Sequence, residues 1–158
     1  MKRRKRIDFK SGDIFTVPLM DNRFTLGQVL DQRWPNVVRI ALFDKTIDRL
    51  QEIDITEFCK SDNLISLVEV TKEQLAFGAW KIVGNKEVNI PISKYPNEQF
   101  RNNQWIGSIT YDAALAEDFL NAFYALIPWD DWYDPHFLEK LLIDISKKPQ
   151  NLILIKTD

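Results

Sequence analysis

Few residues of this chain could carry out catalysis. The sequence contains one histidine and one cysteine, His136 and Cys59, so any Ser–His, Cys–His or histidine–metal site must use His136. His136 follows Pro135 at the expected start of a helix, where the helix dipole disfavours a protonated imidazole. One His and one Cys exclude the ordinary zinc patterns, and no glycine-rich phosphate loop or nucleophile elbow is present. We therefore expect no catalytic, metal-binding or cofactor-binding residue.

The most unusual stretch is IPWDDWYDP at residues 127–135, where aromatic side chains are interleaved with aspartates. Rigid aromatic side chains are typical anchors of protein interfaces, and a ring of negative charge favours a basic partner. The alternative interpretation is an interhelical loop whose aromatic residues pack on a sheet and whose aspartates cap helices. Under the first interpretation, the predicted partner-binding residues are Trp129, Asp130, Asp131, Trp132, Tyr133 and Asp134.

Charge is distributed unevenly along the chain. The formal net charge is −2, but five of the 21 basic residues lie at positions 2–6. Residues 112–139 contain seven acidic side chains and neither Lys nor Arg. A field of one sign repels nucleic acid and favours a basic protein partner. The basic arm at residues 1–10 still leaves a nucleic-acid-binding function open.

Length and composition indicate one ordinary globular domain. The chain has 158 residues, of which 45% are hydrophobic and 12% aromatic, so it can bury a substantial core. Its single cysteine excludes a disulfide framework and is typical of a reducing cytosol. No apolar run approaches the ~20 residues that span a bilayer, and the basic start is followed by polar residues rather than a signal-peptide core. We expect a cytoplasmic protein.

The first 30 residues predict a β-hairpin. Two runs with alternating apolar residues occupy residues 12–30 and meet at an Asp21-Asn22 turn. Pro18 indicates an edge or bulge position, because proline cannot donate a ladder hydrogen bond. Gly27, in the middle of the second run, indicates a bulge or a close backbone contact.

Further strands are expected at residues 36–43, 64–70, 80–83, 88–92 and 105–110. Thr71 and Gln74 have the spacing of a capping box, which predicts a short helix over 72–77 that ends at Gly78. Residues 47–60 fit neither strand nor helix periodicity.

Helical periodicity begins at Asp112. Apolar residues at spacings of three and four predict one helix that ends before Pro128 and a second that starts at Asp134-Pro135 and ends near residue 148. We expect a single domain over residues 1–158 with a basic arm (1–10), a mainly β region (12–110), a helical pair (112–148) and a candidate terminal strand (151–155). The predicted fold class is α+β, with a curled antiparallel SH3-like or barrel-like sheet followed by two C-terminal helices.

The hairpin residues also resemble a known family. Gly12-Asp13-Ile14-Phe15, Val17-Pro18-Leu19, the D-N-R turn, Phe24, Gly27 and Val29-Leu30, preceded by basic residues, resemble the opening of the Immunity protein 26 family. Asn22 stands where that family usually has Gly. The segment Trp80-Lys81-Ile82-Val83-Gly84 is similar to a second, weaker family element, and the acidic helical end lies outside the resemblance.

The resemblance implies a bacterial immunity protein of a polymorphic toxin system. Such proteins sit in the cytoplasm of the toxin-producing cell, bind the effector domain of a cognate toxin and block it. They are inhibitors, and the family has no catalytic residues to transfer to this chain.

Two alternatives remain at this stage. The first is an RNA-cleaving toxin with an SH3-like barrel, similar to the MazF-type endoribonucleases. It requires a basic RNA-binding face, to which Arg23, Arg33 and Arg39 could contribute, although the net acidity disfavours it. The second is a small nucleic-acid-binding module that uses the arm at residues 2–6.

Overall fold

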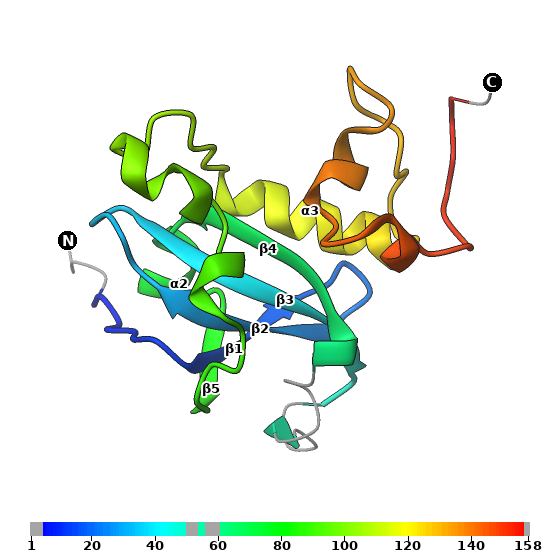
Figure 1. The fold of residues 1–158 in the computed structure, drawn as a ribbon. Helices are drawn as coiled ribbons and strands as arrows, with labels where there is room; N and C mark the ends of the chain where they lie inside the picture. The colour runs from blue at the N-terminus through cyan, green and yellow to red at the C-terminus, as the bar shows by residue number, and fades with distance from the viewer. Residues whose placement is uncertain (1–4, 50–53, 56–60, 157–158) are drawn as a thin grey trace.

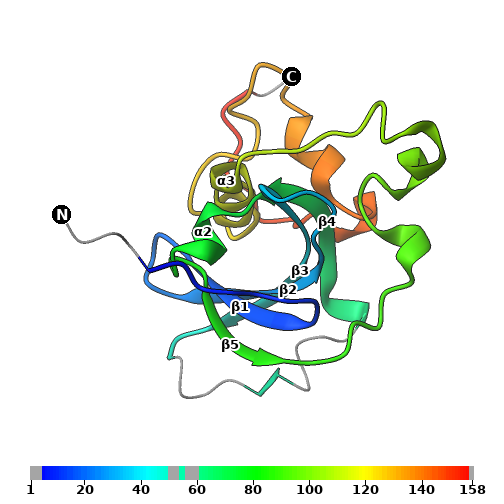
Figure 2. The same ribbon diagram turned by 90° about the vertical axis from the view of Figure 1, so that its left-hand side faces the viewer.

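The computed structural model describes residues 5–49, 54–55 and 61–156. Its centre is an open five-stranded antiparallel sheet with the strand order β4-β3-β2-β1-β5 (Figure 1). The strands are β1 (Asp13–Pro18), β2 (Phe24–Asp31), β3 (Val37–Ile47), β4 (Leu64–Thr71) and β5 (Lys81–Asn85). The sheet is curved, and helix α3 (Ala113–Phe123) lies in its concave side (Figure 2). The predicted α+β class is confirmed, with a sheet that curls without closing.

The predicted hairpin is confirmed as β1 and β2. Asn22 has a φ of 68°, which an asparagine in a tight turn tolerates. A Cβ added to Gly27 would lie 2.4 Å from Cζ of Phe15, so the missing side chain leaves room for that ring. The ring of Phe15 in turn stacks on Trp80 with centroids 5.2 Å apart. Gly27 therefore permits the close contact between strands that its position in the sequence predicts.

The strands predicted at 36–43, 64–70 and 80–83 are present as β3, β4 and β5, but those predicted at 88–92 and 105–110 are wrong. Residues 86–110 leave the sheet as an excursion with two 3-10 helices, η3 (Ile92–Lys94) and η4 (Glu98–Asn103). Trp105 and Gly107 have φ values of 64° and 99°. A strand cannot accommodate such backbone angles.

The helix predicted at 72–77 is confirmed as α2 (Glu73–Ala76), with Gly78 at a φ of 83° beyond its end. The predicted capping box is wrong, because Lys72 is the N-cap and makes no side-chain cap bond. The hydroxyl of Thr71 instead donates to Glu73 Oε1 (2.8 Å) and accepts the Ala113 N–H (3.0 Å). Thr71 thus joins the end of β4 to the start of α3.

The C-terminal helical region begins as predicted and then differs. Asp112 is the N-cap of α3, although its side chain makes no cap bond. The second helical segment is divided into two 3-10 helices, η5 (Phe137–Leu141) and η6 (Ile145–Lys147). Between them the Ile143 N–H donates to the Ile65 carbonyl of β4 (2.9 Å). Pairing with this sheet edge replaces the helical hydrogen bonds that a continuous helix would need.

The ends of the described chain form no additional strand. Residues 152–155 are irregular and contact the loop after α3 through the backbone N–H of Trp129, which donates to the Ile153 carbonyl (2.9 Å). A third 3-10 helix, η2 (Ser61–Asn63), precedes β4. Cys59 and most of the ambiguous region before it lie outside the described residues.

Hydrophobic side chains form a core on each face of the sheet. On the concave face, Phe119 and Leu120 of α3 pack against strand residues such as Ile40. On the opposite face a smaller cluster includes Leu26 and Phe43, with Tyr95, Val88 and Ile90 of the excursion packed on it. Most of the excursion is exposed, so apolar burial alone does not explain how its outer part is held.

Replacing Gly27 with Ala should lower the free energy of unfolding by about 1–3 kcal/mol, because the new methyl group overlaps the Phe15 ring. Urea unfolding measures this loss. In a Phe15→Leu background, the same substitution should cost less, since the smaller side chain relieves the overlap. Equal costs in the two backgrounds would show that the ring contact is not the cause.

Candidate protein-binding site

The acidic aromatic segment predicted at residues 129–134 follows α3 and is anchored by its first two residues. Trp129 is 1% exposed and packs on Phe119 with ring centroids 5.8 Å apart. The carboxylate of Asp130 accepts the N–H groups of Ile155 (2.8 Å) and Lys156 (2.7 Å). These hydrogen bonds hold the pKa of Asp130 below its ordinary value. Trp129 and Asp130 are therefore used inside the chain.

The outer residues of the segment can be reached by a partner. Tyr133 is fully exposed, and Asp131 is exposed beside it. Trp132 is half-buried against Phe137, with centroids 5.2 Å apart. The carboxylate of Asp134 accepts a hydrogen bond from the backbone N–H of His136 (2.9 Å) and lies 3.0 Å from Nζ of Lys140. The segment therefore combines both sequence interpretations, with a packed inner part and an accessible outer part.

The acidic charge of this region is partly neutralised by lysines that follow it in the sequence. Lys140 pairs with Asp134 (3.0 Å) and Lys148 with Glu139 (2.5 Å). Hydrogen bonds from the His136 N–H and then Lys140 lower the pKa of Asp134, and Lys148 lowers that of Glu139. The negative field is thus weaker than the sequence count indicates, and it is concentrated at the exposed residues Asp112, Asp118 and Asp131.

A second cluster, which the sequence analysis missed, surrounds Arg39 in the middle of β3. Arg39 is fully buried, and its guanidinium donates two 2.6 Å hydrogen bonds to Asp31 and one of 2.6 Å to Glu98. Burial lowers the pKa of Arg39, but the bonds with these two carboxylates outweigh it and raise the pKa above its ordinary value. Arg39 also donates to the Pro96 carbonyl (3.2 Å), so it ties β3 to the excursion.

Arg33 and Glu69 form a second buried pair next to it. The Arg33 guanidinium donates two 2.5 Å hydrogen bonds to the carboxylate of Glu69, which is 1% exposed. Glu69 also accepts from Asn97 Nδ2 (3.1 Å) and Thr110 Oγ1 (2.7 Å). A β4 carboxylate therefore holds both ends of the outer part of the excursion.

Trp105 lies among three guanidinium groups. Those of Arg33, Arg39 and Arg101 are 4.7, 5.6 and 4.8 Å from its ring centroid, within the range of cation–π attraction. Gln104 and Trp105 both have positive φ (56° and 64°), which is strained for residues other than glycine. We call Arg33, Arg39, Arg101 and Trp105 the arginine–tryptophan cluster.

The sequence did contain a signal for this cluster. Arg39 interrupts the apolar strand NVVRIALF, and Glu69 interrupts LISLVEV. A charged residue within a buried strand requires a partner of opposite sign. The same burial removes support for an RNA-binding face, since Arg33 and Arg39 are neutralised inside the chain. Arg23 pairs with Asp21 (2.6 Å) and lies over the ring of Tyr124.

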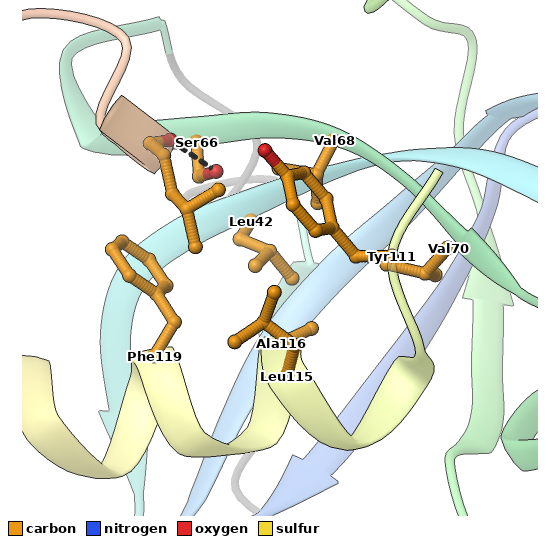
Figure 3. A pocket seen from close by; sticks show the side chains of 9 residues that line it. Leu42, Ser66, Val68, Val70, Tyr111, Leu115, Ala116 and Phe119 are labelled. Carbon is orange, nitrogen blue, oxygen red and sulfur yellow. Dashed lines mark hydrogen bonds between the residues drawn. The ribbon is translucent and has the colours of Figure 1, made fainter. Parts of the chain in front are cut away.

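Two cavities among the described residues can be compared with the requirements of catalysis. The cavity in Figure 3 has a volume of about 10 Å³, roughly that of one water probe, and is lined by apolar side chains with Ser66 and Tyr111. Ser66 Oγ donates to the Leu141 carbonyl (2.5 Å). An open groove of about 420 Å³ beside β4 has a leucine-rich floor with Lys94 and Lys140, without a paired acid and base. No grouping of three His, Cys, Asp or Glu suited to a metal occurs within residues 5–49, 54–55 and 61–156.

The described residues form an α+β domain that presents aromatic, acidic and arginine side chains on its surface. The model of the family Immunity protein 26 matches residues 10–105, more than half of the chain, so this chain belongs to that family. The matched region includes the whole sheet and the arginine–tryptophan cluster, while α3 and the acidic aromatic segment follow it. No curated protein and no solved structure matches the chain. In the part of the chain that the structure describes, none of the helices has the length and apolar character needed to cross a membrane.

Replacing Glu69 with Gln should lower the free energy of unfolding by roughly 3 kcal/mol, because the buried Arg33 guanidinium loses its counter-charge. Chemical denaturation measures the change. Glu87→Gln, at an exposed position, provides the matched control and should change stability by less than about 0.5 kcal/mol. Similar effects of the two substitutions would contradict the assigned role of Glu69.

The attachment of the C-terminal segment should be lost in acid. The pKa of Asp130 is lowered from 3.8 in the folded protein, so its carboxylate stabilises the fold above that value and loses this effect as pH falls through the lowered pKa. The amide NMR signals of Ile155 and Lys156 should shift with a midpoint below pH 3.8. Asp130→Asn should remove that transition. A midpoint at or above 3.8 would contradict the assigned hydrogen bonds.

Proposed function

We propose that this protein neutralises a bacterial toxin by binding the toxin's effector domain stoichiometrically and covering its active site. The membership of the Immunity protein 26 family carries this proposal, because a protein of this family has a toxin as its partner. The partner-binding role also fits surfaces that present aromatic and arginine side chains, which are enriched in the centres of protein interfaces. In this proposal the protein is an inhibitor that acts in the cytoplasm and performs no catalysis.

The proposed contacts include the outer part of the acidic aromatic segment: Asp131, Trp132, Tyr133 and Asp134. Tyr133 and Trp132 supply large apolar surfaces with few rotatable bonds, and Asp131 and Asp134 supply negative charge. Trp129 and Asp130 support the segment from inside. A toxin that acts on nucleic acid has a basic substrate cleft, and an acidic surface of this kind could occupy it in place of a phosphate backbone.

Co-expression tests the proposed function directly. The product of the adjacent upstream gene should arrest growth when expressed alone, and this chain should restore growth and co-purify with that product at a fixed ratio. The chain expressed alone should be harmless. Growth arrest by the chain itself, or no binding to a product that is toxic on its own, would contradict the proposal.

Reversing the exposed charges of the segment should slow association with the toxin. Asp131→Lys with Asp134→Lys should lower the association rate constant about tenfold at low salt, because electrostatic steering is lost. The difference should shrink as salt is added. Surface plasmon resonance against the catalytically inactivated toxin measures both effects.

The control should carry the same change in net charge on another part of the surface. Asp8 and Glu87 are both exposed and lie far from the segment in the sequence, so Asp8→Lys with Glu87→Lys is suitable. The control should alter the association rate less than the test variant does. Equal slowing by the two variants would indicate that net charge, and no local contact, sets the rate.

A further inference from the structure

Exposed apolar side chains gather around the arginine–tryptophan cluster. Trp34, Ile106 and Ile109 are 50%, 63% and 57% exposed. Trp34 lies over the guanidinium of Arg33 at 5.6 Å, and Ile106 follows Trp105 directly. The backbone N–H and C=O of Ile109 both bond to the side chain of Asn97 (2.9 Å each). Large apolar side chains presented together on a rigid support indicate a protein-binding surface.

The backbone of this surface is held in a costly conformation. Two successive residues, Gln104 and Trp105, have positive φ, which is strained for residues other than glycine and persists only where surrounding contacts enforce it. Two kinds of contact enforce this conformation. The guanidinium groups of Arg33 and Arg101 lie against the Trp105 ring, and the backbone N–H of Trp105 donates to the Phe100 carbonyl (2.8 Å). The strain places Ile106 outside the cluster with its side chain toward solvent.

Arg101 gives the surface its charge preference. Its side chain is 52% exposed, and its guanidinium group pairs with Glu98 (2.5 Å). Glu98 also pairs with the buried Arg39, and the guanidinium group of Arg39 forms a second ion pair with Asp31. Arg101 can therefore turn to a carboxylate of a partner without leaving a buried charge unpaired. Arg33 and Arg39 cannot do this, because each neutralises a carboxylate inside the fold.

This surface and the acidic aromatic segment lie at the two ends of α3. The excursion passes around the β4 edge of the sheet and leads into the start of α3, and the segment follows the end of α3 (Figures 1 and 2). A helix of 11 residues is about 16 Å long. A standard protein interface of ~800 Å² per partner is roughly 30 Å across, so one partner can cover both.

We propose that Trp34, Arg101, Trp105, Ile106 and Ile109 form a second contact for the same toxin, and that the toxin places there an apolar side chain flanked by a carboxylate. This inference rests on the proposed function. The partner that it describes has a basic patch facing Asp131 and an acidic residue facing Arg101, at the two ends of α3. Opposite charges at two separated contacts fix the orientation of a partner as well as attract it.

Two substituted chains test the surface against the catalytically inactivated product of the adjacent upstream gene. Trp34→Ala with Ile106→Ser should raise Kd at least tenfold, mainly through faster dissociation, because a central apolar contact is lost. Arg101→Glu should also raise Kd at least tenfold, because it brings a negative charge to the partner's carboxylate. Ile145→Ser is the matched control, since Ile145 is also 63% exposed but lies in η6, and its Kd should stay within twofold.

Hydrogen exchange of the unsubstituted complex provides a measurement that does not depend on the folding of variants. Amides of residues 104–109 should exchange more slowly in the complex than in the free chain, while those of 145–147 should be unchanged. This inference would be overturned if the wild-type chain binds the toxin, the variants bind it with unchanged Kd, and the amides of residues 104–109 exchange equally fast in the complex and in the free chain. That result would leave the proposed function standing. Failure of the wild-type chain to bind or neutralise the toxin would overturn both.

Discussion

The structure depends on how the buried charge of Arg39 is balanced. Arg39 lies in the middle of the central sheet with no exposed surface, and its two carboxylate partners come from β2 and from the excursion. Moving a guanidinium out of water costs several kcal/mol unless good geometry and further hydrogen bonds compensate. Here the compensation requires Glu98 to approach β3, so the sheet can bury Arg39 only when residues 96–98 are docked. The charge thereby specifies the position of a segment that apolar packing alone would leave undetermined.

The residues that follow the excursion and the residues that follow α3 cover the β4 edge of the sheet. The outer edge of β4 pairs with Tyr111 near one end, where the Tyr111 N–H donates to the Glu69 carbonyl (2.9 Å). Near the other end, Leu142 and Ile143 pair with Ser66 and Ile65. An exposed edge strand is a template for unintended pairing with other chains. Because β4 is covered in this way, the proposed recognition of a partner uses side-chain surfaces at the ends of α3 and does not require pairing with this strand.

The sequence predicted the elements whose determinants are local. Alternation of apolar residues was sufficient for β1 and β2, and short apolar runs were sufficient for β3 and β4. The need for space around Gly27 could be inferred from a glycine in mid-strand. The strand expected at 105–110 failed because Trp, Ile and Thr favour strands. The Trp105 ring instead contacts Arg33 of the β2–β3 loop and Arg39 of β3, which are distant in sequence, as well as the nearby Arg101 of η4. The capping box failed for a similar reason, since the Thr71 hydroxyl is engaged with Ala113 of α3.

The charge of the predicted site also depends on contacts that its local sequence does not show. Counting acidic residues from 112 to 139 overstated the negative field, because Lys140 and Lys148 lie just beyond that window and pair back onto it. The residue types of the aromatic segment were informative, but which of them face solvent depends on the C-terminal residues that dock on Asp130. Arg39 and Glu69 could have been identified from the sequence as buried charges that need partners, although the spacing gives no indication that Glu98 and Arg33 are those partners.

Both surfaces at the ends of α3 have exposed side chains supported by buried ones. Trp129 and Asp130 fix the backbone from which Asp131 and Tyr133 project, and Arg33 with Glu69 fixes the platform beneath Trp34 and Trp105. A contact that is already ordered before binding avoids about 0.5–1.5 kcal/mol of ordering cost for each immobilised side chain. Under the proposed function, the inhibitor must bind tightly enough to keep its target blocked, and internal tryptophans and ion pairs that stabilise the free chain would also strengthen its complex. In that case the residues that hold the fold together contribute to affinity without touching the partner.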